Sequence, residues 1–366
     1  MIIRINSSNN IKEAAKKIFS AADKKGTIPI LSNFLLEAEG NSLKLTATNL
    51  EIGASVIVED CEVVEAGKTT VNAQKFTKLI SNLSDMEMEI SLNENKLLVK
   101  TAKSKFSLAT LEAEEFPEIT VPENFDIAIP TDEFEKAIKK TAYAASKDEA
   151  RYILTGVFLK SFGDKLHAVA TDGHRLALYE IKVNAPEFQA LIPRKAISEV
   201  RKILKDGDEV LLALLENKIY FKVGNTLMWS SLIEGEYPDY LAVIPGSNPL
   251  CVEVDKEELL SALKEISAIY DKEEVRAVIV NLTSGNMKLT AKKLDGEVDE
   301  EAEVILPADY SQDEFEIGFN INHLLESVSS FDESLIKIYM DSPTSPVLVV
   351  GDEEPQLKNV IMPMKV

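Results

Sequence analysis

Hydrophobic and polar residues alternate along three widely separated stretches of this chain, and the three stretches are alike. They read LKLTATNLEIG at Leu43 to Gly53, LHAVATDGHRLA at Leu166 to Ala177 and MKLTAKKLDGE at Met287 to Glu297. Alternation with a period of two predicts half-buried β-strands, and each stretch runs into a turn. The copies recur about every 120 residues, which is far longer than a solenoid unit, so we expect three whole domains of one design.

The similarity continues on both sides of these stretches. Upstream, strand-like runs end at a glycine turn at residues 30–40, 153–163 and 275–285. Helical patterns stand before and after each alternating stretch, and those after it are opened by Asn or Pro. The predicted helices cover residues 10–22, 72–83, 131–145, 193–204, 255–270 and 320–331. Each copy therefore holds two helices and many short strands, which is the element content of an α+β protein.

The composition limits the class of protein. The chain has 366 residues, of which 45% are hydrophobic, and no long uninterrupted apolar run, which indicates a soluble multidomain protein with a sizeable core. Its opening, MIIRINSSNN, lacks the apolar stretch of a signal peptide. Cys61 and Cys251 lie in different copies without metal-like spacing. We therefore expect a cytoplasmic protein with reduced thiols and no membrane contact.

The formal net charge of −21 argues against ordinary nucleic-acid binding, because phosphate contacts need basic patches. The predicted helices nevertheless carry much of the basic charge. Their basic residues include Lys12, Lys16 and Lys17 in the first, Lys136, Lys139 and Lys140 in the third, and Arg194, Lys195, Arg201, Lys202 and Lys205 in the fourth. Acidic residues gather elsewhere, so one interpretation is a basic face on an acidic body. Solvated helix faces without a partner are the alternative.

Signals for catalysis are weak. The segment EAGKTT resembles the end of a phosphate-binding loop, but Glu62 stands where that motif needs its first glycine. In TDGHR, Asp172 and His174 bring an acid close to an imidazole, yet no nucleophile motif accompanies them. His167, His174 and His323 are too scattered to indicate a metal site. We expect a protein that is not an enzyme and holds no cofactor.

Two segments suggest peptide binding instead. The TDGHR turn differs from TNLEI and KKLDG, which occupy its place in the sister copies, and it exposes Thr171, His174 and Arg175 beside the apolar Leu176. The last seven residues, VIMPMKV, supply flexible apolar side chains of a kind common at adaptable peptide-binding surfaces. A groove shared by these two segments is one interpretation.

The segments ATDGHRLA, IPILSNFLL, LIPRKAISEV, EYPDY and MPMKV together resemble, in order and over the whole chain, the bacterial DNA polymerase III beta subunit family of sliding clamps. The resemblance implies three clamp domains at 1–125, 126–248 and 249–366, each with two helices packed on antiparallel sheets, in a ring-forming head-to-tail homodimer. It implies a non-catalytic processivity subunit that encircles duplex DNA without sequence preference, tethers the replicative polymerase and other replication or repair factors, and depends on a clamp loader. A peptide-binding adaptor that never encircles DNA is the alternative.

The resemblance also implies three sets of site residues. The pocket for the clamp-binding motif of partner proteins comprises Leu154, Thr171, Gly173, His174, Arg175, Leu176, Pro238, Val243, Ser345, Val360, Met362, Pro363 and Met364. Contacts with DNA are implied for Lys25, Lys147, Arg151 and Tyr152, to which we add Lys195, Arg201 and Lys202 of the basic fourth helix. The ring interface pairs Lys75, Lys103, Lys105, Phe106 and Leu108 with Ile269, Tyr270, Glu300, Glu301 and Glu303 of the other subunit. Ile153 and His323 replace aromatic residues of some relatives near the DNA and pocket sites.

Overall fold

The described part of the chain contains six α-helices. A computed structural model describes residues 1–23, 26, 28–270, 277–295 and 298–365. Within them the helices are α1 (Ser8–Ile18), α2 (Ala73–Ser81), α3 (Thr131–Thr141), α4 (Arg194–Ile203), α5 (Lys256–Ser267) and α6 (Ile321–Ser329). All the predicted helices are confirmed. The first begins earlier than expected, because Ser7 is its N-cap and accepts a hydrogen bond from the Asn9 amide.

The chain forms two compact units, each with its own sheets. The first comprises Met1–Glu135 and Lys195–Leu232. Its strands are β1 (Ile2–Ile5), β2 (Asn33–Glu39), β3 (Ser42–Thr48), β4 (Ile52–Val58), β5 (Cys61–Glu65), β6 (Gly67–Asn72), β7 (Met88–Asn93), β8 (Lys96–Lys100), β9 (Lys105–Ala109), β10 (Ile127–Pro130), β15 (Glu209–Leu215), β16 (Lys218–Val223) and β17 (Thr226–Ser231). They form a five-stranded sheet, β5-β1-β7-β8-β9, and an eight-stranded sheet, β10-β15-β16-β17-β4-β3-β2-β6.

The second unit comprises Lys136–Arg194 and Ile233–Val366. Its strands are β11 (Gly156–Ser161), β12 (Lys165–Thr171), β13 (Arg175–Lys182), β14 (Gln189–Pro193), β18 (Leu250–Asp255), β19 (Ala277–Thr283), β20 (Asn286–Asp295), β21 (Val298–Pro307), β22 (Phe315–Asn320), β23 (Leu335–Met340), β24 (Val347–Val350) and β25 (Leu357–Ile361). They form an eight-stranded sheet, β14-β11-β12-β13-β25-β24-β23-β18, and a four-stranded sheet, β21-β20-β19-β22.

Each eight-stranded sheet joins strands from two of the sequence repeats. In the first unit, β4 pairs antiparallel with β17, so that Gly53 faces Trp229. In the second unit, β13 pairs antiparallel with β25, so that Leu176 faces Val360. An isolated repeat would expose the edges of these strands, and their pairing satisfies the backbone groups along both edges.

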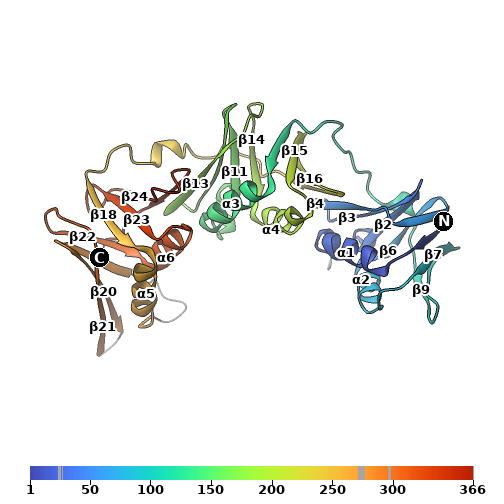
Figure 1. The fold of residues 1–366 in the computed structure, drawn as a ribbon, viewed down its shortest axis with the longest axis horizontal. Coiled ribbons are helices and arrows are strands. Elements are labelled where there is room, and N and C mark those ends of the chain that lie inside the picture. Colours follow the sequence, from blue (N-terminus) through green and yellow to red (C-terminus); the bar gives the residue numbers. More distant parts are fainter. Residues whose placement is uncertain (24–25, 27, 271–276, 296–297, 366) are drawn as a thin grey trace. The chain divides into compact units, whose positions relative to one another are not determined.

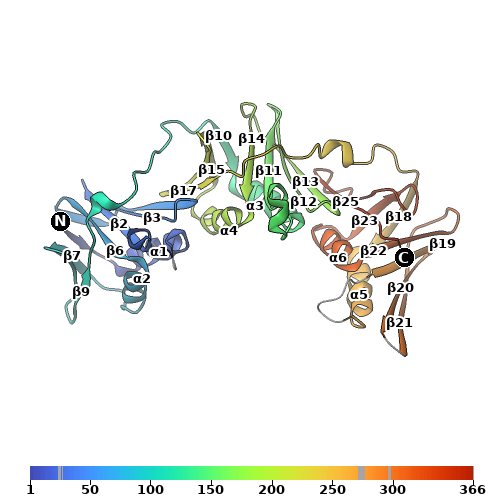
Figure 2. The same cartoon turned by 180° about the vertical axis from the view of Figure 1, so that it is seen from behind.

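The helices bury apolar faces against these sheets. In the first unit α1 and α2 lie side by side and α1 packs on β3 and β4 (Figure 1). In the second unit α5 and α6 lie side by side, α5 against β20 and β21 and α6 against β22 and β25 (Figure 2). The buried residues Ile11, Ala15 and Ile18 recur at helical spacing along α1, as expected for a surface helix with one apolar stripe.

Candidate functional site

The turn between β12 and β13 is built by its own side chains. The Thr171 hydroxyl donates to the Arg175 carbonyl at 2.5 Å and accepts from the Gly173 amide at 3.1 Å. Asp172 Oδ1 accepts from the amides of His174 and Arg175 at 2.9 and 3.1 Å. Side chains of Thr and Asp favour turns through such local bonds. Gly173 has φ +86°, a left-handed conformation that glycine adopts without strain.

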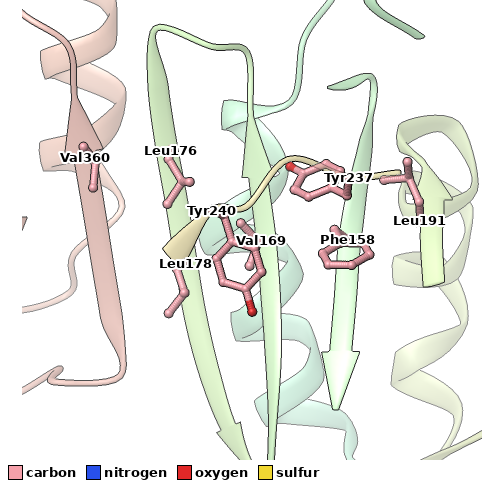
Figure 3. Close-up of a cluster of buried hydrophobic side chains, with 8 residues drawn as sticks. All are labelled: Phe158, Val169, Leu176, Leu178, Leu191, Tyr237, Tyr240 and Val360. Carbon is pink, nitrogen blue, oxygen red and sulfur yellow. The ribbon is translucent and has the colours of Figure 1, made fainter. Parts of the chain in front are cut away.

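Beside this turn lies an apolar cavity of about 130 Å³, which we call the β13 pocket. It is lined by Leu154, Thr171, Gly173, Arg175, Leu176, Pro238, Tyr240, Val243, Val360 and Met362. Behind it is a buried cluster, in which the segment carrying Tyr237 and Tyr240 crosses β11, β12 and β13 (Figure 3). The Tyr237 ring stacks on Phe158 with centroids 4.5 Å apart. The pocket is therefore an apolar depression that borders a packed aromatic cluster, which it shares through Tyr240.

The structure brings nine of the thirteen predicted pocket residues together in this lining. The other four, His174, Ser345, Pro363 and Met364, lie outside it. The His174 carbonyl still shapes the pocket, because it accepts a 2.8 Å hydrogen bond from the Met362 amide and so holds the C-terminal segment beside the turn. The sequence prediction missed Tyr240, although its motif EYPDY was one of the segments that carried the family resemblance.

Arg175 is a structural cation of the pocket wall. Its side chain is 8% exposed. Nε lies 3.1 Å from Asp172 Oδ2, Nη1 pairs with Glu326 of α6, and Nη2 donates to the Tyr143 carbonyl at 3.0 Å. A buried guanidinium needs such partners, because an uncompensated charge is costly away from water. Arg175 thus joins the turn to α6 through three of the five N–H donors of its guanidinium.

The predicted DNA residues stand in separate parts of the chain. Lys25 lies outside the described residues. In the second unit Lys147 and Tyr152 are exposed, while Arg151 Nη1 donates to the Asp172 carbonyl at 3.0 Å. In the first unit Lys195, Arg201 and Lys202 are exposed on α4. The last two also lie near carboxylates, with Nη2 of Arg201 3.8 Å from Glu135 and Nζ of Lys202 2.5 Å from Glu199.

One lysine of the predicted basic helices is not on the surface. Lys140 of α3 is 3% exposed, with Nζ 2.8 Å from Asp332 Oδ2 and paired with Glu354 as well. The hydrogen bond from Lys140 lowers the pKa of the Asp332 carboxyl. The expectation that all three lysines of this helix contribute to a basic face is therefore wrong for Lys140, whose charge is neutralised inside the second unit.

The predicted interface residues lie on and beside two edge strands. Lys105, Phe106 and Leu108 belong to β9, at the edge of the five-stranded sheet. Lys103 is exposed just before β9 in the sequence, and Lys75 is exposed on α2. Glu300, Glu301 and Glu303 are exposed on β21, at the edge of the four-stranded sheet. Ile269 and Tyr270 follow α5, and the Tyr270 hydroxyl donates to the Ala277 carbonyl at 2.7 Å. Edge strands present unpaired backbone groups that can pair with another chain.

Metal-binding clusters and membrane-spanning helices are not found in the described ranges. No group of three or more His, Cys, Asp or Glu side chains among these residues is arranged to hold a metal ion. The rings of His174 and His323 stack with centroids 6.2 Å apart, without a third such partner in that set. No helix within the same residues is long and apolar enough to cross a membrane.

The fold is that of a sliding clamp. A DNA polymerase III subunit beta structure from Pseudomonas aeruginosa matches with a TM-score of 0.93 and 31% identity, covering 100% of both chains. A DNA polymerase sliding clamp from Caulobacter crescentus matches with the same TM-score, identity and coverage. A DNA polymerase sliding clamp from Bacillus subtilis matches with a TM-score of 0.94 and 25% identity, covering 100% of this chain and 99% of the other.

Sequence comparisons identify the family. Models for the N-terminal, central and C-terminal domains of the DNA polymerase III beta subunit match residues 1–120, 128–239 and 241–365. The beta sliding clamp of Pseudomonas aeruginosa is 32% identical over 356 residues, covering 95% of each chain, and that of Caulobacter vibrioides is 33% identical over 370 residues, covering 97% of each. The chain belongs to the DNA polymerase III beta subunit family. Its function is that of a DNA sliding clamp.

Proposed function

We propose that two copies of this chain join head to tail into a ring around duplex DNA, and that the β13 pocket tethers the replicative polymerase and other replication or repair proteins. The clamp performs no chemistry of its own and works in the cytoplasm, where a separate clamp loader opens it. Its domains span 1–125, 126–248 and 249–366. The observation that carries the tethering proposal is the apolar β13 pocket, with nine predicted residues in its lining.

The ring accounts for a strongly acidic protein that holds DNA. A closed ring traps the duplex topologically, so it needs only weak contacts that do not prevent sliding. Exposed basic residues supply a weak attraction to phosphates that is independent of sequence. The proposed contact residues are Lys25, Lys147, Arg151, Tyr152, Lys195, Arg201 and Lys202. The net charge of −21 on the chain as a whole disfavours nonspecific capture of DNA from outside.

The proposed ring closes through the edge strands β9 and β21. In β9, Lys105 is exposed, and Phe106 and Leu108 are half-buried. In β21, the edge strand of the four-stranded sheet, three glutamates are exposed. Basic and acidic edges are complementary in charge, and pairing them would extend both sheets. Subunits joined head to tail form either a closed ring or an open filament. We propose a closed ring of two subunits with three domains each.

The β13 pocket suits an extended peptide with apolar anchors. Leu154, Leu176, Val360 and Met362 give it aliphatic walls, and a thioether adapts to side chains of different shape. A Leu or Phe side chain entering this space exchanges water contact for apolar contact.

The test of encirclement is topological. The chain is loaded onto nicked circular DNA by a compatible loader with ATP, and its retention is measured before and after the circle is cut once. We expect retention on the circle and release from the linear form, because a closed ring cannot leave a circle but can slide over a free end. Retention on both forms would contradict encirclement. Absence from both, with a loader proven active on another clamp, would favour a peptide-binding adaptor.

A further inference from the structure

A buried histidine stands behind the wall of the β13 pocket. His167 lies on β12, and its Nδ1 is 2.9 Å from the hydroxyl oxygen of Tyr240, which lines the pocket. On its other side, Nε2 is 3.2 Å from Glu180 Oε2, and that oxygen accepts from Lys165 Nζ at 3.1 Å. We propose that His167 is a positioning residue for partner binding, which fixes the Tyr240 ring and with it the width of the pocket.

The chain of contacts has one consistent assignment of protons. The pKa of Glu180 is lowered because hydrogen bonds from Lys165 and His167 outweigh its burial, so its carboxylate is ionised and can only accept. The Nε2 of His167 therefore carries the proton that is donated to Glu180. Nδ1 is then a free acceptor, and the Tyr240 hydroxyl donates to it. This arrangement requires a neutral imidazole, because a protonated ring would present a second N–H to the tyrosine.

Both members of the pair are enclosed. His167 is 6% exposed and Tyr240 is 4% exposed. The imidazole lies against the Phe162 ring at 4.8 Å between centroids and meets the Tyr240 ring edge-on at 5.9 Å. Burial holds the pKa of Tyr240 at about 12, so its hydroxyl keeps its proton across the physiological range. A hydroxyl in such a place has little water to bond instead, which makes the imidazole the group that sets its position.

Burial lowers the pKa of the His167 imidazole and favours its neutral form, and the charges around the ring act in both directions. Glu180 faces it from β13, Lys160 stands opposite it on β11, Lys165 shares its strand, Lys358 lies on β25, and Asp239 precedes Tyr240. Burial is the main cause that lowers the pKa of His167, Lys165 and Lys358 add to it, and Glu180 opposes it. Acidification below the ordinary histidine range therefore converts a hydrogen-bond acceptor into a donor beneath the pocket wall.

The effect reaches the pocket through a short segment. Tyr240 is the N-cap of the 3-10 turn Leu241–Val243, and its carbonyl accepts from the Val243 amide at 3.3 Å. Val243 is itself part of the lining. A shift of the Tyr240 ring therefore moves two lining residues together. Since the pocket that binds peptide is the one with neutral His167, bound peptide and protonation oppose each other.

Two substitutions of His167 separate its contacts. In His167→Asn the amide oxygen occupies the place of Nδ1, so an acceptor for Tyr240 remains but cannot titrate. In His167→Gln the amide replaces Nε2 near Glu180, and the acceptor for Tyr240 is lost. Tyr240→Phe removes the same hydrogen bond from the other side while it keeps the aromatic wall. These three variants and His167→Gln/Tyr240→Phe form a matched set for a double-mutant cycle.

This inference rests on the proposed function, so peptide binding and the position of the Tyr240 side chain are measured separately. A fluorescent peptide containing Gln, Leu and Phe is titrated by anisotropy at pH 7.5 and 5.5, and the fold is checked by circular dichroism. At pH 7.5 we expect His167→Asn to bind like the parent and His167→Gln and Tyr240→Phe to bind about fivefold more weakly, with no further loss in the double variant. On going from pH 7.5 to 5.5 the parent should lose more affinity than His167→Asn, because only the parent can gain a proton at this place. Acid effects that arise elsewhere in the protein are common to the parent and His167→Asn, so the comparison of the two removes them.

A crystal structure of His167→Gln supplies the second readout. We expect the Tyr240 ring to be displaced. One outcome is that the parent and Met362→Glu both fail to bind the peptide while Tyr240 is displaced in His167→Gln. In that case the peptide-binding function is wrong, but His167 still positions Tyr240. If the parent binds and His167→Gln matches its affinity with Tyr240 unmoved, the positioning role is wrong. Equal acid dependence in the parent and His167→Asn would also overturn it.

Discussion

The indole of Trp229 lies directly over the backbone of Gly53, its partner across the β4–β17 pair. A Cβ added to Gly53 would stand 2.0 Å from Cζ2 of the Trp229 ring. Trp229 is 2% exposed and packs with Tyr220 and Ala213. At the corresponding place in the second unit, Leu176 faces Val360, and both line the β13 pocket. The space that is open in one unit is filled by an indole in the other.

The two units share the turn that precedes this place. In the first unit the Thr48 hydroxyl donates to the Ile52 carbonyl at 3.1 Å and accepts from the Leu50 amide. Asn49 Oδ1 accepts from the amides of Glu51 and Ile52, as Asp172 does for its own turn. The repeats therefore keep one backbone design and differ in side-chain filling: an indole packs over Gly53 after the TNLEI turn, whereas the β13 pocket borders the TDGHR turn.

Gly53→Ala tests how tightly Trp229 fills its space. The added methyl overlaps the ring, so the indole or β4 must move, and we expect the free energy of unfolding to fall by about 1–3 kcal/mol. Urea denaturation followed by tryptophan fluorescence measures this directly, since the chain has one tryptophan. Gly246→Ala is the control, because its Cβ would have no heavy atom within 4 Å. A midpoint for Gly53→Ala equal to that of the control would show that the ring is loosely held.

Lys140 and Lys139 give opposite expectations on one helix. Lys140→Met leaves the largely buried carboxylate of Glu354 without the cation that pairs with it. Breaking such an ion pair costs about 3 kcal/mol of stability. Lys139 is exposed on the same helix. Lys139→Met should therefore leave thermal stability unchanged while it weakens attraction to DNA. Differential scanning calorimetry and salt-dependent DNA binding separate the two effects, and equal melting temperatures for both variants would contradict the structural role of Lys140.

Local signals in the sequence were sufficient to predict the helices. Asn72 and Asn320 each accept amide hydrogen bonds at the start of a helix, and these caps could be read without knowledge of tertiary contacts. The threefold repeat and the family resemblance likewise placed the turn and the C-terminal segment in one pocket. These features succeed because the residues that determine them are adjacent in the chain or are repeated along it.

Contacts between distant segments could not be read in the same way. The burial of Lys140 depends on Glu354, which is 214 positions away, and a lysine on an amphipathic helix is ordinarily expected in water. Tyr240 lines the pocket because its segment crosses three strands. The role proposed for His167 depends on this contact with Tyr240, which is 73 positions away in the chain. The filling of the first-unit space likewise depends on strand register between Gly53 and Trp229, which no local pattern specifies.

Acid should destabilise the fold through its buried histidines. Burial lowers the pKa of both His167 and His323 below the ordinary value of 6.5, with nearby Arg175 as the next cause for His323. Between the lowered pKa and 6.5 the unfolded chain binds more protons, so stability falls as the pH decreases through this window. The difference in thermal midpoint between His167→Asn and the parent should grow in favour of the variant from pH 7.5 to 5.5. A difference that does not change with pH would contradict the depressed pKa of His167.

Met362→Glu tests the β13 pocket without disturbing the chain terminus. A carboxylate at this place in the apolar lining would lose hydration on peptide binding, so we expect at least about a tenfold loss of affinity for a Gln- and Leu/Phe-containing peptide. Deleting 362–366 should abolish binding too, but it also removes the 2.8 Å bond from the Met364 amide to the Gly318 carbonyl. Lys365→Glu is the control for added charge, since Lys365 is exposed. Unchanged anisotropy titrations for Met362→Glu would place the partner site elsewhere.

The ring interface is tested by reversing charges on its two edges. Lys103→Glu/Lys105→Glu places acidic side chains on and beside β9, opposite the proposed glutamates of β21, and like charges across an interface cost several kcal/mol. We expect this variant to be a monomer by light scattering. Adding Glu300→Lys/Glu301→Lys to the same chain restores complementary signs, so the combined variant should recover the mass of a dimer. A dimer that survives the first reversal, or a combined variant that stays monomeric although folded, would show that these strands do not form the contact.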